Sequence, residues 1–220
     1  ITNFSYTQFM ATNGYELRFS NSTQTVELNY EVERWNPAGN SYVWVNLPTL
    51  SAAGDYIWAY WGDTNLSTAP AAYTTNGSTW NSDYRGVWNM QLPSTNLFDS
   101  TTNQINGVTM TKTTIAATNA DAKVSLGVSF DSCFNGPQTN WIIMKDKATG
   151  AETNVNIGVG GDHAYTMEQW VYVQDTNAEA FAGANGAFWC YGSGGNYRQI
   201  SLTISHNTYA VSNGFWGINH

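Results

Sequence analysis

Short runs of alternating apolar and polar residues recur along the chain and constrain its fold more than any other feature. In residues 26–33, apolar side chains at the even positions alternate with Glu or Asn at the odd positions. Residues 124–130 and 200–204 alternate in the same way, and residues 165–173 have the composition of a further strand. Successive side chains of a strand point to opposite faces, so half-buried strands produce this pattern. The sequence therefore predicts many short strands.

Turn signals and composition support the same fold class. Asn-Gly pairs at residues 13–14, 76–77 and 106–107 lie between the runs, and such pairs favour tight turns. Charged residues make up 11 % of the 220 residues, against about 25 % in an average globular protein. Ser, Thr, Asn and Gly are abundant instead, and they favour turns over long helices. We expect an all-β protein built from β-sandwich or jelly-roll units.

Charge and hydrophobicity exclude two classes of function. The net charge is −8 with eight Lys and Arg, so the chain has no basic stripe to offset the phosphates of a nucleic acid. No apolar run approaches the roughly 20 residues of a membrane span. The first residues, 1–4, look like the interior of a domain, so we expect a processed or partial product without a membrane span.

Two cysteines, Cys133 and Cys190, leave a single possible pairing. In an exported protein such a pair favours a disulfide, and low charge with no complete catalytic motif also points outside the cell. We expect a disulfide and an extracellular or cell-surface location.

A resemblance to a known family lies in residues 14–63. Residues 14–19 read GYELRF, 27–36 read ELNYEVERWN, 41–48 read SYVWVNLP and 56–63 read YIWAYWGD. This ordered set resembles a family of unknown function that occurs on large exported bacterial proteins. The resemblance covers roughly residues 10–90 and implies a non-catalytic extracellular module, to which we assign residues 1–85.

The remaining residues, 86–220, resemble a laminin-G-like (concanavalin A-like) module, which typically follows that family. Residues 86–90 and 99–103 fit its opening, although Asn89 stands where that opening usually has His. The resemblance implies a jelly roll that lacks its last strands. Either the parent chain is longer, or a neighbouring subunit adds a strand, and such addition could propagate into a filament.

Three residues near the start of that module are candidate calcium ligands: Asp99, Asn103 and Asn106. Their side-chain oxygens suit a hard cation, and some laminin-G-like modules carry such a site. The alternative is an Asx-rich turn in which these side chains bond to their own backbone.

Two further sets of residues are candidates for carbohydrate chemistry. Glu27, Glu31 and Glu33 could form the carboxyl pair of a glycosidase, or they could be the solvated face of a strand paired with Arg18 or Arg34. Trp80, Trp141, Trp189 and Trp216 could stack on sugars or fill a core. We expect a non-catalytic adhesion or structural protein that contacts a glycan or matrix component, with carbohydrate binding as a candidate role; the alternative is a polysaccharide-degrading enzyme or its binding module.

Overall fold

A computed structural model describes residues 4–91, 96–109, 122–128, 142–145, 164–171, 186–192, 199–204 and 211–215. Its strands are β1 (Arg18–Ser20), β2 (Glu27–Leu28), β3 (Tyr30–Arg34), β4 (Tyr42–Val45), β5 (Trp58–Tyr60), β6 (Asn96–Leu97), β7 (Asn106–Thr109), β8 (Ile142–Lys145), β9 (Gly186–Gly192), β10 (Gln199–Ile204) and β11 (Val211–Phe215). The helical elements in these ranges are short 3-10 turns, η1 (Tyr6–Gln8), η2 (Thr64–Leu66) and η3 (Ala72–Thr74). The all-β prediction is therefore confirmed for the described residues.

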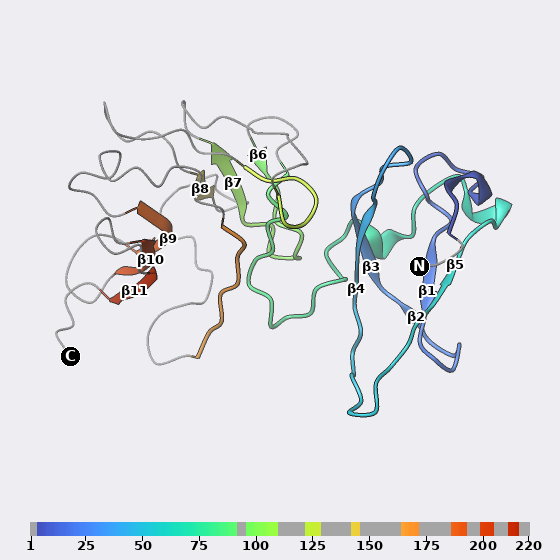
Figure 1. The fold of residues 1–220 in the computed structure, drawn as a ribbon, viewed down its shortest axis with the longest axis horizontal. Coiled ribbons are helices and arrows are strands. Elements are labelled where there is room, and N and C mark those ends of the chain that lie inside the picture. The colour runs from blue at the N-terminus through green and yellow to red at the C-terminus, as the bar shows by residue number, and fades with distance from the viewer. Residues whose placement is uncertain are drawn as a thin grey trace.

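The strands form small antiparallel sheets. In the N-terminal part, one sheet has the order β2-β1-β5 and β3 pairs with β4. In the C-terminal part, the orders are β6-β7-β8 and β11-β10-β9. Figure 1 shows β1 to β5 gathered at one end of the molecule and β6 to β11 at the other, joined by the segment that follows β5.

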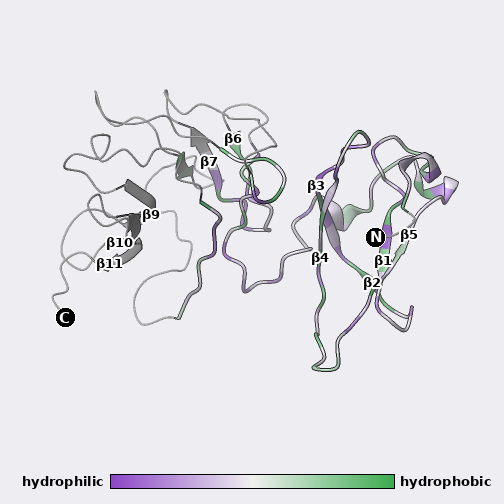
Figure 2. Ribbon diagram, viewed as in Figure 1, coloured by the Kyte–Doolittle hydropathy of each residue, from purple (hydrophilic) through white to green (hydrophobic). Residues whose placement is uncertain are grey.

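The core of the N-terminal part consists of Leu17, Phe19, Leu28 and Tyr30. The rings of Phe19 and Tyr30 meet edge to face, with their centroids 5.2 Å apart. The Tyr30 hydroxyl donates to the Leu17 carbonyl, which satisfies its polar atom in an otherwise apolar site. Figure 2 shows hydrophobic and hydrophilic residues interleaved along these strands, as the alternation in residues 26–33 predicts for its Leu28 and Tyr30 positions.

The predicted strand over residues 26–33 is divided at Asn29. Asn29 separates β2 from β3, and these two strands belong to different sheets. The Asn29 side-chain amide donates to the Ser78 carbonyl over 3.0 Å, and its own carbonyl accepts from the backbone N–H of Asn46 over 2.8 Å. Because the chain changes sheets here, Glu27 and Glu31 do not form one carboxylate row on a single strand.

Two strand predictions in the C-terminal part are wrong for the residues described. Residues 123–125 form a bend in which Ser125 takes a positive φ of 52°, outside the extended region, and residues 126–128 are irregular. Residues 164–171 are irregular and mostly exposed. By contrast, β10 confirms the strand predicted at 200–204, and β9 and β11 flank it.

None of the helical turns in the described part of the chain has the length and apolar character that a bilayer crossing requires.

Candidate functional site

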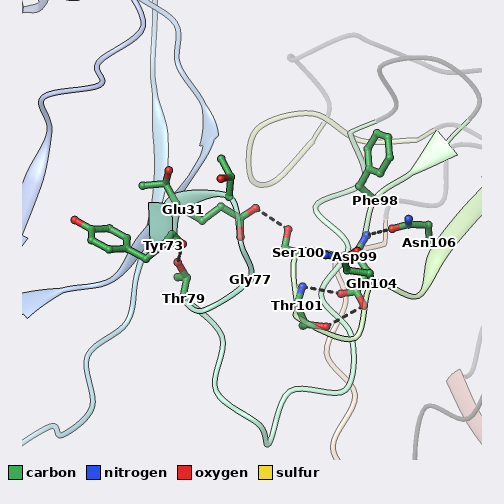
Figure 3. Close-up of a pocket in the computed structure, with 12 residues that line it drawn as sticks. Glu31, Tyr73, Gly77, Thr79, Phe98, Asp99, Ser100, Thr101, Gln104 and Asn106 are labelled. Atoms are coloured by element: carbon green, nitrogen blue, oxygen red, sulfur yellow. Dashed lines mark hydrogen bonds between the residues drawn. The ribbon is translucent and has the colours of Figure 1, made fainter. Parts of the chain in front are cut away.

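A cleft of about 440 Å³ lies between β3 and the loop that joins β6 to β7, and Glu31 stands at one side of it (Figure 3). We call it the Glu31 cleft. Glu31, Tyr73, Gly77, Phe98 and Asp99 line it together with side chains that carry hydroxyl or amide groups, which are Thr74, Thr75, Thr79, Ser100, Thr101, Gln104 and Asn106. The lining joins segments that are far apart in the sequence, so it exists only in the folded chain.

The Glu31 carboxylate accepts three hydrogen bonds from side chains in residues 80–100. Its Oε1 accepts from the Ser100 hydroxyl over 2.6 Å and from the Asn89 amide over 3.0 Å. Its Oε2 accepts from the Trp80 indole N–H over 2.6 Å. Hydrogen bonds to a charged acceptor are stronger than neutral ones. Glu31 therefore ties β3 to residues 80–100.

Burial raises the pKa of the Glu31 carboxyl above its ordinary value of 4.5. Hydrogen bonds from Ser100 and Trp80 act in the opposite direction, since they stabilise the ionised form, and the neighbouring Glu33 carboxylate raises the pKa again. A carboxyl with a raised pKa in a cleft is typical of functional sites, although structural networks produce the same effect.

Trp80 holds Glu31 from outside the cleft lining. Its ring packs against Trp44 and Tyr84, at centroid distances of 5.8 Å and 5.0 Å. With its N–H on Glu31, Trp80 is half-buried. The structure thus uses this predicted sugar-stacking residue to position Glu31, while stacking on a sugar stays a prediction.

Asp99 organises the opposite wall of the cleft. Its Oδ1 accepts from the backbone N–H of Val87 and of Thr101, over 3.0 Å and 2.9 Å. Its Oδ2 accepts from the Thr101 hydroxyl and from the backbone N–H of Ile105, both over 2.9 Å. A carboxylate offers about four acceptor positions. The buried Asp99 side chain therefore has all of them in use to shape residues 99–105.

The other two candidate calcium ligands join the same turn. The Asn106 side-chain oxygen accepts from the Asp99 backbone N–H over 2.9 Å, and the Asn103 amide donates to the Tyr84 and Arg85 carbonyls. The structure thus brings the three residues together as an Asx-rich turn. No cluster of three His, Cys, Asp or Glu side chains suited to a metal occurs among the described residues. Calcium binding by these residues stays untested, and the contacts of Asp99 favour the Asx-rich turn.

A glycine allows the two walls of the cleft to approach each other. Gly77 has a φ of +85°, and a Cβ placed on it would lie 2.6 Å from the Thr102 nitrogen and 2.7 Å from the Thr101 carbonyl carbon. Because these neighbours are backbone atoms, they cannot move aside for a side chain at position 77. The Asn76-Gly77 turn therefore packs directly against the loop that Asp99 organises.

The two other glutamates predicted as candidates lie elsewhere. Glu27 forms an ion pair with Arg18, with 3.5 Å between Nε and Oε1, as the solvated-face interpretation predicts. It also accepts from the Tyr73 hydroxyl, and burial together with that bond raises the pKa of Tyr73. The Glu33 carboxylate accepts from the Trp44 indole N–H over 2.7 Å. Neither lines the Glu31 cleft.

Several predicted residues fall beyond the description. Trp141, Trp216 and Cys133 lie outside the described residues. Trp189 and Cys190 lie on β9, where their backbones pair with Leu202 and Ser201 of β10, and their side chains are not described. The disulfide and the three C-terminal tryptophan platforms stay predictions.

The described residues thus define an all-β protein with a cleft between the half-buried Glu31 carboxylate and the turn that Asp99 organises. Residues 13–105 match the family model described as Domain of unknown function (DUF2341). No curated protein and no solved structure matches the chain. The match confirms the resemblance to a family of unknown function, and it includes every residue of the Glu31 cleft lining except Asn106.

Proposed function

We propose that this protein is a non-catalytic, exported surface or adhesion protein that binds a neutral glycan in the Glu31 cleft. The observation that carries the proposal is the lining itself, in which hydroxyl and amide groups accompany the Glu31 and Asp99 carboxylates and the exposed ring of Phe98. Sugar hydroxyls both donate and accept, so a wall with mixed polarity can pair with them. A phenyl ring supplies a flat apolar face for the C–H side of a sugar.

Individual side chains take specific parts in this proposal. Phe98 is 54 % exposed at the cleft, so its ring is open to a ligand. Among the described residues, Glu31 Oε2 accepts one hydrogen bond and keeps acceptor capacity for a sugar hydroxyl. Ser100 and Asn89 hold the carboxylate in place, which lowers the entropy lost on binding.

The wider architecture belongs to the same proposal. Residues 1–85 form one β-sandwich module, and residues 86–220 form a laminin-G-like jelly roll closed by the Cys133–Cys190 disulfide. The low charge and the family resemblance support a cell-surface or extracellular location. The proposal also includes assembly of chains through an added strand.

A second function is a glycoside hydrolase with Glu31 as its general acid, which the raised pKa of Glu31 favours. Glycosidases need a second carboxyl as base or nucleophile. The other carboxylate described in the lining, Asp99, already accepts four hydrogen bonds from the protein itself. Binding without hydrolysis is therefore the better supported function.

A glycan array with the whole chain, run with and without calcium, tests the proposal. We expect binding to neutral glycans that weakens in Phe98→Ala and persists in Trp170→Ala, which removes an exposed ring outside the cleft. Hydrolysis of a bound glycan that is lost in Glu31→Gln would establish the enzyme instead.

A further inference from the structure

The outer face of the sheet β2-β1-β5 carries a row of exposed aromatic side chains. Tyr56, Trp58 and Tyr60 alternate along β5 and the residues before it, and they are 61 %, 42 % and 41 % exposed. The residues between them, Ile57 and Ala59, pack against the core instead. Period-two geometry therefore places Trp58 and Tyr60 on one side of β5, about 6.7 Å apart along the strand, and the ring of Tyr56 contacts that of Trp58. Within the described residues β5 pairs only with β1, and Figure 1 shows the two side by side.

The structure holds these rings in fixed orientations. The Trp58 indole N–H donates to the Ser22 carbonyl over 3.1 Å, and the Ser20 hydroxyl donates to the Tyr60 oxygen over 3.4 Å. The ring of Tyr56 meets that of Trp58 edge to face at 5.9 Å. A row of rings that is already ordered loses little entropy when a ligand binds.

A second cavity adjoins this row at Tyr60. It measures about 260 Å³, and its lining includes Ser20, Gln24, Thr25 and Tyr60, which offer neutral donors and acceptors. Register places Arg18 opposite Tyr60 and Ser20 opposite Trp58, so the polar cavity and the aromatic row belong to one sheet face. Its lining shares no residue with that of the Glu31 cleft.

The charges at this face select an uncharged ligand. Arg18 and Glu27 both line the cavity, and they neutralise each other through their ion pair. The whole chain carries a net charge of −8, which repels anionic polymers. An uncharged ligand with apolar ring faces and polar edges therefore matches the face better than an acidic one.

We propose that this face is a second glycan-binding site, at which a neutral polysaccharide chain lies along Tyr56, Trp58 and Tyr60. Sugar rings stack on the aromatic faces, and hydroxyls of a sugar at the Tyr60 end enter the cavity to reach Ser20, Gln24 and Thr25. The inference does not depend on ligand binding in the Glu31 cleft. It rests on the alternation of β5 and on the adjoining neutral cavity.

Affinity electrophoresis of the whole chain tests this site, with hydroxyethyl cellulose, glucomannan or xylan in the gel and alginate as the anionic comparison. We expect retardation by at least one neutral polymer and none by alginate. Trp58→Ala should weaken the retardation about tenfold, because it removes one stacking ring. Trp58→Phe keeps a ring and should keep most of the binding.

Two further variants separate this proposal from its alternatives. Trp170→Ala, which removes another exposed indole, should retain the retardation, and Phe98→Ala should remove at most the part that the Glu31 cleft contributes. Loss in Phe98→Ala but not in Trp58→Ala would overturn the second site and leave the cleft as the glycan site. Absence of retardation by every neutral polymer, or a dimer in sedimentation that only Trp58→Ala dissociates, would also overturn it.

Discussion

Substitution of Glu31 tests whether this carboxylate joins β3 to residues 80–100. Glu31→Ala removes the acceptor of three hydrogen bonds, from Ser100, Asn89 and Trp80. At about 1.5 kcal/mol each, the low end for a charged acceptor, these bonds total about 4.5 kcal/mol. Removal of a carboxylate that is costly to bury offsets part of this loss. We expect the free energy of unfolding to fall by about 2–3 kcal/mol at neutral pH.

Glu31→Gln separates the hydrogen bonds from the charge. The new amide oxygen can still accept from Trp80, and the new amide nitrogen can donate to the Ser100 oxygen. If the Asn89 side-chain amide flips, its oxygen can also accept from that nitrogen. We expect this variant to lie within about 1 kcal/mol of the wild type at neutral pH.

The pH dependence has a definite sign. Because burial raises the folded-state pKa of Glu31 above 4.5, the folded protein binds more protons than the unfolded chain between those two pKa values. This contribution to stability is fully present below about pH 4.5 and is lost as the pH rises through the folded-state pKa. The free energy of unfolding of the wild type should therefore fall relative to that of Glu31→Gln over that pH window. Above the window the difference between the two proteins should stay constant.

Urea unfolding followed by tryptophan fluorescence at several pH values measures all three proteins. Glu33→Ala is the matched control, since its carboxylate accepts one described side-chain hydrogen bond, from Trp44 near the surface, and should lose under about 1 kcal/mol. Equal losses of stability in Glu31→Ala and Glu33→Ala would refute the reasoning. It would also be refuted if the wild type became more stable relative to Glu31→Gln as the pH rises.

Three further predictions follow from the cleft and the cysteines. Gly77→Ala should destabilise the protein by about 2 kcal/mol or more beyond the loss in Gly54→Ala, measured in the same urea assay. Both glycines have a positive φ, but only Gly77 has backbone atoms within 3 Å of the added Cβ. Equal losses in the two variants would mean that the 76–77 turn does not pack on residues 101–102. Asp99→Ala should cost about 3–5 kcal/mol, since its carboxylate accepts four hydrogen bonds in a buried turn, and calcium should leave the melting temperature of the wild type unchanged; a marked rise with calcium would instead support a metal site there. Mass spectrometry of unreduced protein should find Cys133 and Cys190 joined, and two free thiols would contradict both the bond and an oxidising compartment.

Local patterns in the sequence predicted part of the local structure, although the Asn106-Gly107 pair, predicted as a turn, lies in β7. Alternation identified Leu28 and Tyr30 as core positions, and the Asn76-Gly77 pair identified a turn that has a positive φ at glycine. These features depend on neighbours in the sequence, so composition and spacing carry them. The resemblance also identified the right kind of family for residues 13–105.

Local sequence patterns could not predict the hydrogen-bond partners of Glu31. Trp80, Asn89 and Ser100 lie 49, 58 and 69 residues away in the sequence. Period two put Glu31 on a polar face, but it could not show that another segment covers that face. The break at Asn29 is equally hidden, because its amide bonds to Ser78 across the fold.

The predicted tryptophans illustrate the same limit. Trp80 was a candidate sugar platform, yet Tyr56, Trp58 and Tyr60 form the exposed row. The sequence contained the signal for this row, since aromatic residues occupy alternate positions in 56–60. It could not show which of the two faces of that strand is packed, because Trp61 on the opposite face is aromatic too.

The most direct test of the central proposal is calorimetric titration of a neutral oligosaccharide into the wild type, Glu31→Gln and Glu33→Gln, followed by mass spectrometry of the recovered sugar. We expect the wild type and Glu33→Gln to bind alike. Binding to Glu31→Gln should weaken at least about tenfold, because a hydrogen bond to a charged group contributes about 1.5–3 kcal/mol. The recovered sugar should be intact. Equal binding by all three proteins, or a cleaved sugar, would contradict non-catalytic glycan binding in the Glu31 cleft.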